Sequence, residues 1–137
     1  MIRDKDVSNV LKDDGVARVD LTSFVNPTTT SFNDIKANMG TGSWAVRVIY
    51  NKAFGGVLIK QLPDECNRLH YHPDSDECWI IMEGTLEWEI EGKDRRVVTV
   101  GDIVVVKAGT KHLIRNIGIG PAIRFAFAKP DVEHVYG

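Results

Sequence analysis

From residue 44 to residue 128 the sequence falls into short runs rich in valine, isoleucine and aromatic residues, with glycine, aspartate, asparagine and proline between them. Such runs are typical of β-strands, and the residues between them are typical of tight turns. Many short strands at regular spacing favour a sandwich or a barrel. The sequence therefore predicts an all-β fold, with strands at 44–50, 56–62, 68–72, 77–83, 86–91, 95–100, 103–106, 112–116 and 121–128.

Alternation within two of these runs indicates which side chains share a face, because successive side chains of a strand point to opposite sides. In the run 86–91, the apolar residues lie opposite three glutamates, which is typical of a half-buried strand. In the run 121–128, Ile123, Phe125 and Phe127 share one face. We expect core packing for both phenylalanines.

The first forty or so residues differ from the rest. Residues 7–12 are compatible with a short helical turn, and residues 16–21 alternate weakly like a strand. Ser31, followed three residues later by Asp34, is typical of a helix start. The helix would end at Gly40. We therefore expect an N-terminal arm that contains a short helix.

Length and composition limit the classes of function. A chain of 137 residues supports one core, so we expect the arm at 1–43 and a single barrel domain at 44–137. The net charge of −2 gives no electrostatic reason to expect nucleic acid or an anionic membrane as partner. No apolar run reaches the length of a membrane span or a signal segment, so a cytoplasmic location is expected. Cys66 and Cys78 then fit two free thiols better than a disulfide.

Four polar residues predict a metal site. His70 and His72 are two residues apart, a spacing that points both side chains to the same face of a strand. A turn through the next four residues would let the following strand bring Glu77 back to them, and His112 follows a later apolar run. Imidazole nitrogens with one carboxylate suit a divalent transition metal. Iron, manganese, nickel, copper and zinc all suit such a donor set.

A histidine pair of this kind can also be two polar residues on the solvated face of a strand. However, three of the four histidines in the chain belong to this pattern, and apolar runs flank it. Burying these groups without a partner would be costly, and a metal ion removes that cost. We therefore prefer the metal site. His134, in the C-terminal tail, is not expected to be a ligand.

The same residues resemble two motifs of the cupin superfamily, G-x5-H-x-H-x3-4-E-x6-G and G-x5-P-x-G-x2-H-x3-N. Two positions depart from the motifs: Asp64 replaces the opening glycine of the first, and Lys107 replaces the proline of the second. Neither change removes a ligand. The matching positions are His70, His72, Glu77, Gly84, Gly101, Gly109, His112 and Asn116.

The resemblance implies a double-stranded β-helix, which is a jelly-roll barrel, with one metal ion held by the four ligands. It also implies a homodimer, since small cupins commonly pair. It does not fix the reaction, because the superfamily includes dioxygenases, decarboxylases, isomerases, lyases, epimerases and non-catalytic sensors.

The preferred function is a mononuclear metal-dependent enzyme acting on a small carboxylate, keto or hydroxy compound. Oxygenase chemistry with iron is the leading class, and a non-redox lyase or isomerase is the alternative. A small-ligand sensor without catalysis is a third hypothesis, which the complete ligand set disfavours.

Two residues are candidates for catalytic roles. Arg68 could clamp a substrate carboxylate, because a guanidinium offers a planar fork of donors. A solvated arginine at the start of a strand is an equally good interpretation. Arg47 and Arg124 are alternatives for the clamp, on strands whose facing the sequence does not fix. Tyr50 is the candidate proton donor.

Overall fold

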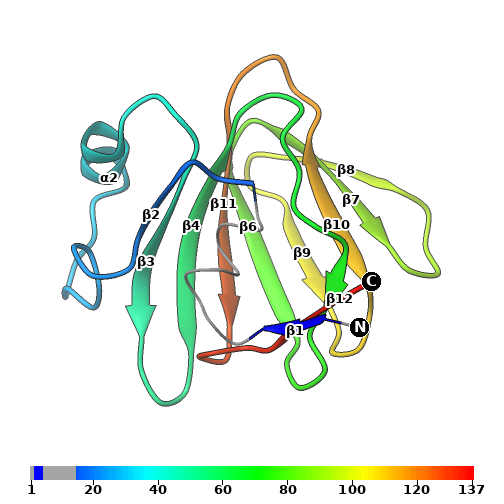
Figure 1. The fold of residues 1–137 in the computed structure, drawn as a ribbon. Coiled ribbons are helices and arrows are strands. Elements are labelled where there is room, and N and C mark those ends of the chain that lie inside the picture. Colours follow the sequence, from blue (N-terminus) through cyan, green and yellow to red (C-terminus); the bar gives the residue numbers. More distant parts are fainter. Residues whose placement is uncertain (1, 5–14) are drawn as a thin grey trace.

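The computed structural model of the protein describes residues 2–4 and 15–137. In this part of the chain, twelve strands form two six-stranded sheets that face each other (Figure 1). Sheet A has the order β1 (Ile2–Asp4), β12 (His134–Tyr136), β5 (His70–Tyr71), β10 (His112–Asn116), β7 (Thr85–Ile90) and β8 (Arg96–Thr99). Sheet B has the order β2 (Arg18–Asp20), β3 (Trp44–Tyr50), β4 (Gly55–Gln61), β11 (Ala122–Ala128), β6 (Glu77–Glu83) and β9 (Ile103–Val106). The predicted jelly-roll barrel is confirmed.

The interior between the sheets is filled by alternate side chains of the strands. Leu86 and Trp88 of β7 are fully buried, as the alternation of that run predicts. Trp79 of β6 meets Trp88 edge to face, with 5.4 Å between the ring centroids. Such a pair buries a large apolar area, so the two indoles form a solid middle layer of the barrel.

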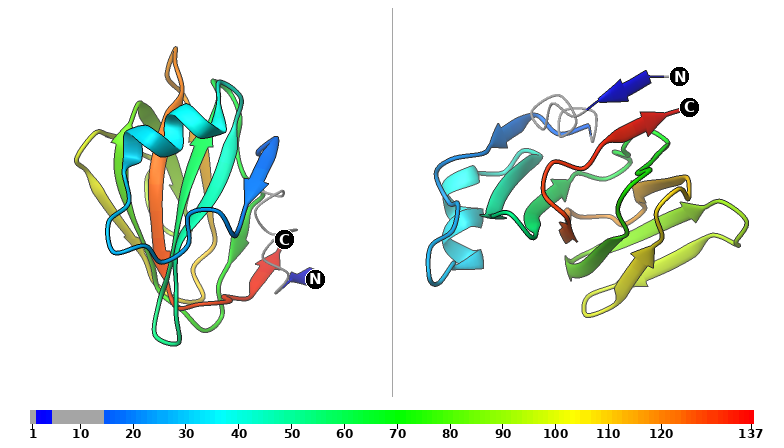
Figure 2. Two further views of the ribbon diagram at one scale, coloured as in Figure 1. Left: turned by 90° about the vertical axis from the view of Figure 1, so that its left-hand side faces the viewer. Right: turned by 90° about the horizontal axis from the view of Figure 1, so that it is seen from below.

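The helix α2 (Phe32–Met39) lies across the outer side of sheet B (Figure 2). Ser31 caps its start, with its hydroxyl accepting a hydrogen bond from the backbone N–H of Asp34 at 3.2 Å, as the sequence predicts. Gly40 ends it with a φ of 84°. Ile35 and Met39 are buried in an outer apolar cluster. The sheet residues of that cluster are Trp44, Val46, Val48, Leu58 and Ile123.

The described parts of the N-terminal arm are joined to the barrel. β2 pairs in parallel with β3, and β1 pairs antiparallel with β12. The predicted helical turn at 7–12 lies outside the described residues. The division into an arm at 1–43 and a barrel at 44–137 stays a prediction, although two strands of the arm extend the two sheets.

In two strands, β11 and β3, the direction of the side chains departs from regular alternation or from the predicted inner face. On β11 the barrel interior receives Arg124 and Ala126, which are buried, while Phe127 on the opposite face is 38% exposed and contacts Phe54. The expected core role of Phe127 is therefore wrong, and the reason is that the aromatic face of β11 is its outer face. On β3 a bulge between Arg47 and Ile49 shifts the register of pairing with β4.

Among the described residues, the single helix is too short and too polar to cross a membrane. Cys66 and Cys78 are both free thiols, as predicted.

Candidate metal centre

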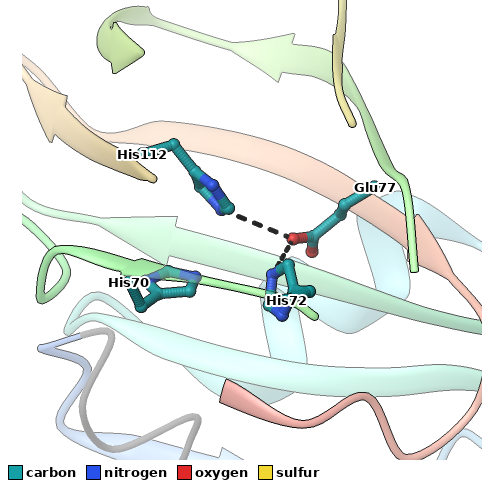
Figure 3. Close-up of side chains that lie close together, drawn as sticks. All are labelled: His70, His72, Glu77 and His112. Carbon is teal, nitrogen blue, oxygen red and sulfur yellow. Dashed lines mark hydrogen bonds and ion pairs between the residues drawn. The ribbon is translucent and has the colours of Figure 1, made fainter. Parts of the chain in front are cut away.

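Four side chains from both sheets converge at one end of the barrel interior (Figure 3). They are His70, His72, Glu77 and His112, and their nearest potential ligand atoms all lie within 4.8 Å of one another. His70 and His112 face each other on the paired strands β5 and β10 of sheet A. His72 follows β5 directly, and Glu77 begins β6 of sheet B. The sequence hypothesis named the same four residues.

The short segment between His72 and Glu77 is fixed by the loop that precedes His112. The backbone N–H of Gly109 donates to the carbonyl oxygen of His72 at 2.7 Å. The carboxylate of Asp76 accepts from the backbone N–H of Ala108 at 2.8 Å. These bonds tie the two halves of the ligand set together, so that residues far apart in the sequence keep one geometry.

The three histidines of the cluster share one orientation. In each ring Nδ1 donates to a backbone carbonyl oxygen: His70 to Arg68 at 2.6 Å, His72 to Glu133 at 3.1 Å and His112 to Thr110 at 3.0 Å. A carbonyl oxygen can only accept, so these contacts place the proton on Nδ1. The lone pair of each Nε2 is then available to a metal ion, which is how metal-binding histidines are commonly oriented.

The inner atoms of the cluster fit a metal ion better than they fit one another. Nε2 of His112 is buried and has no hydrogen-bond partner, although it lies 3.7 Å from a carboxylate oxygen of Glu77. The same oxygen of Glu77 lies 2.6 Å from Nε2 of His72. A buried nitrogen without a partner is costly, and a divalent ion among the four groups would satisfy it. The donor set, three imidazoles and one carboxylate, suits a transition metal.

The electrostatic state of the cluster suits metal binding at neutral pH. Burial, together with the neighbouring His112, lowers the pKa of His70 to about 2, so this ring is neutral. Burial by itself would raise the pKa of Glu77, but His72 and His112 outweigh that effect and hold the pKa well below its usual value. The cluster therefore offers a neutral imidazole and a carboxylate without first having to lose protons.

One residue beside the cluster was not expected there. His134 begins β12, which pairs with β5, and it is buried. Its ring stacks on His70 and meets His72 edge to face, with centroids 4.7 Å and 4.3 Å apart. Burial lowers its pKa to about 4. It stands apart from the four clustered ligands, but its place in the tail gave no sign that it would line the site.

A cleft of about 90 Å³ leads from the surface to the cluster. Glu77 and His134 form its inner end, while Arg47, Tyr50 and Asp131 lie toward the outside. A smaller chamber of about 20 Å³ continues inward past the same Glu77 and His134, as far as Trp79 and Arg124. A small molecule can therefore approach the cluster through this cleft, which the protein encloses only in part.

The candidate catalytic residues fall in different places. Arg68 is exposed, and its guanidinium stacks on the ring of Tyr136 at 4.5 Å, outside the residues that line the cleft. Tyr50 lines the cleft, and its hydroxyl donates to Asp131 at 2.5 Å, which raises the pKa of this phenol. The clamp role of Arg68 and the proton-donor role of Tyr50 stay predictions. Of the alternatives, Arg47 lines the cleft, and Arg124 lines the inner chamber, where it donates to Gln61.

Sequence comparison finds relatives over part of the chain. YdbB of Bacillus subtilis is 34% identical over 67 residues, a match that covers 42% of this chain and 59% of YdbB. The tetracenomycin polyketide synthase protein TcmJ of Streptomyces glaucescens is 32% identical over 83 residues, covering 56% of this chain and 54% of TcmJ. The chain thus spans a little over half the length of these two relatives.

Solved structures with a similar fold cover more of the chain. A conserved protein of Klebsiella pneumoniae with a double-stranded β-helix domain has a TM-score of 0.60 at 21% identity, over 79% of this chain and 84% of that protein. The DMSP lyase DddQ of Ruegeria pomeroyi has a TM-score of 0.58 at 20% identity, over 65% of this chain and 47% of DddQ. A sugar phosphate isomerase of Silicibacter pomeroyi has a TM-score of 0.52 at 26% identity, over 56% of this chain and 50% of the isomerase.

The family comparison covers the segment that builds the cluster. The family model for the cupin domain matches residues 58–127, which include all four clustered side chains and both motifs that hold them. That match extends over half of the chain, and the chain therefore belongs to the cupin family.

Proposed function

We propose that the protein is a mononuclear metal-dependent enzyme acting on a small oxygen-bearing molecule, such as a carboxylate, keto or hydroxy compound. One observation carries the proposal: three oriented imidazoles cluster around Glu77, and Glu77 itself lines the inner end of an open cleft. Structural metal sites are usually closed by protein ligands on all sides, whereas catalytic sites keep a position open. The cleft supplies that open side.

The bound metal would hold and polarise a substrate oxygen, and iron would in addition allow chemistry with dioxygen. The protein contributes the rest. The backbone carbonyls of Arg68, Glu133 and Thr110 fix the ligand rings, Trp79 closes the floor beside His112, and the cleft limits access of water. Iron is the first candidate metal, with manganese, nickel and zinc as alternatives.

Two reaction classes are compatible with this site. An iron-dependent oxygenase is the first candidate, supported by the imidazole and carboxylate donor set. A non-redox lyase or isomerase is the second, and it is favoured by His134, whose ring lines the cleft beside the ligands and could carry a proton during the reaction. The lyase and isomerase names among the structural neighbours agree with the second candidate.

The metal content of the purified protein tests the proposal. We expect about one equivalent of metal in the parent. We expect its loss in His112→Ala, because that change removes a ligand, and its retention in His134→Ala, which removes a neighbouring imidazole outside the ligand set. Metal added in excess should raise the melting temperature of the parent and of His134→Ala, but not that of His112→Ala. Full metal content in His112→Ala would overturn the ligand assignment.

Reaction class is then tested with the metal-loaded protein on small keto, hydroxy and carboxylic acids. The name of the relative TcmJ adds aromatic polyketide-type compounds to the panel. Turnover that stops when oxygen is removed would establish the oxygenase. Turnover that continues under nitrogen and is lost in His134→Gln would establish the lyase or isomerase. Metal-dependent binding without turnover of any compound would favour a sensor instead.

A further inference from the structure

The outer end of the cleft carries an arginine, Arg47, that forms no ion pair with any acidic side chain of the described residues. Arg47 lines the cleft, and its guanidinium stacks on the ring of Tyr50 at 4.0 Å. We propose that Arg47 binds an anionic group of the substrate while the opposite end of the same molecule reaches the metal ligands. This inference rests on the proposed function and adds to it the substrate class, namely elongated molecules with a metal-binding end and a distal carboxylate or similar anion.

The placement of Arg47 depends on the bulge in β3. Positions 47 and 50 differ by an odd number, so a regular strand would point Arg47 and Tyr50 to opposite faces. The register instead shifts between Arg47 and Ile49, and Arg47 pairs with Val57 while Tyr50 pairs with Gly55. Val57 and Gly55 lie on the same face of β4, so both β3 side chains point into the cleft. Bulges often re-aim side chains at functional sites.

The charge of Arg47 is available to a ligand. Two lysines of the described residues differ from Arg47 in having acidic partners: Lys129 contacts Asp74 and Lys36 contacts Glu83. Among the described residues, the guanidinium of Arg47 contacts the ring of Tyr50 and forms no ion pair, which leaves its edge free to donate to a carboxylate. The nearby Asp131 accepts the hydroxyl of Tyr50 instead.

The space between Arg47 and the ligands is kept open by small residues. Ala126 and Ala128 of β11 and Gly55 of β4 line the cleft between the two ends. Strands β11 and β4 separate β6, which carries Glu77, from β3. Three strand spacings give a separation of about 14 Å along the sheet, which the reach of the arginine shortens. The walls are mainly apolar, so the body of the substrate should be apolar as well.

The test uses two matched series of 2-oxo acids of increasing chain length, titrated calorimetrically into the metal-loaded protein under nitrogen. One series ends in a second carboxylate, from 2-oxoglutarate to 2-oxosuberate, and the other ends in a methyl group. Their common 2-oxo acid end can bind the metal. We expect the diacid of fitting length to bind about tenfold more tightly than its monoacid. The preference should vanish in Arg47→Gln and persist in part in Arg47→Lys.

The matched control is Arg96→Gln, which removes the same charge from an exposed position on β8, at the edge of sheet A. It should keep the full preference for diacids. Retention of the preference in Arg47→Gln, or equal binding of both series at every length, would overturn the proposed role of Arg47 and leave the proposed function standing. Binding that does not depend on the metal would contradict the proposed function, while a diacid preference that still needs Arg47 would continue to support the arginine site. If neither series binds at all, both proposals fail.

Discussion

Asn116 and Asn67 at the closed end of the barrel interior differ in their hydrogen bonding from His112 at the open end. At the closed end, Asn116 donates from Nδ2 to the carbonyl oxygens of Gln61 and Gly120, both at 3.0 Å, and accepts from the backbone N–H of Gly118 at 2.9 Å. Asn67 accepts from the backbone N–H of Ile114 at 2.7 Å. At the open end, Nε2 of His112 is equally buried but has no hydrogen-bond partner.

The difference distinguishes buried polar groups that stabilise the fold from buried polar groups that are available to a ligand. A buried amide that is fully bonded to the backbone holds strands and loops together, because breaking it leaves unsatisfied groups. A buried nitrogen that is oriented toward a metal position but forms no hydrogen bond makes the metal-free protein less stable and the metal-bound protein more stable. The closed end should therefore respond to mutation whether or not metal is present, and the open end should respond to metal and to protons.

The largest expected effect is the loss of stability of the metal-free protein in acid. The pKa of His70 is lowered to about 2 and that of His134 to about 4, both below the ordinary 6.5, because burial disfavours their charged forms. Between pH 7 and pH 5 the unfolded chain takes up protons that the folded chain does not, so stability falls as the pH falls. The loss at pH 5 is about 2 kcal/mol for each histidine. Urea unfolding at several pH values measures it.

The control for this effect is His134→Gln, which should lose about half of the pH dependence in the same window. The lowered pKa of Glu77 acts in the same direction but at lower pH, since its carboxyl group in the unfolded chain protonates near 4.5. An unfolding free energy that stays constant from pH 7 to pH 5 would contradict the burial of neutral rings at the open end.

At the closed end, Asn116→Ala should cost about 2 kcal/mol of unfolding free energy in both the metal-free and the metal-loaded protein. It removes two donated bonds and one accepted bond, and it takes this donor from the carbonyl oxygens of Gln61 and Gly120. Metal content should stay that of the parent. Asn33→Ala, an exposed asparagine in α2, is the control and should change stability little. A loss of metal in Asn116→Ala with normal stability would contradict the assignment of a structural role to the closed end and a metal-binding role to the open end.

The smallest expected effect lies outside the barrel. Ser31→Ala removes the cap of α2 and should lower stability by about 1 kcal/mol. Metal content should not change, because the helix packs on the outer face of sheet B and the cluster lies on the inner side. Thr41→Ala, an exposed position just beyond the helix, serves as the control in thermal unfolding. A drop in metal content in Ser31→Ala would show that the outer layer shapes the site.

One departure from the family motif is explained by the backbone. Asp64 stands where the first motif opens with glycine, and it has a φ of 69°. This left-handed conformation suits glycine, and aspartate tolerates it better than most residues. The backbone N–H of Asp64 donates to the carbonyl oxygen of Asn116 at 3.0 Å, so the turn still anchors the closed end. Gly84 keeps the motif residue, and a Cβ there would lie 2.5 Å from the carbonyl oxygen of Pro121.

Much of the fold could be predicted from local sequence. The strands from 44 to 128 lie within one or two residues of the predicted runs, and the helix begins and ends at its predicted caps. These elements depend on alternation, turn residues and capping, which act over a few residues. β12 was missed because three residues of tail carry too little pattern, and its pairing with β1 and β5 joins segments distant in the sequence.

The sequence by itself determined the identity of the four clustered residues, because their spacing and their positions beside apolar strands leave few other roles for them. Only the tertiary structure decided what surrounds them. It brought His134 against His70, turned Arg68 outward onto Tyr136, and used a bulge to place Arg47 beside Tyr50. The physical reason is range: alternation fixes a side chain's face within one regular strand, while bulges and long-range pairing reset that face from outside the strand.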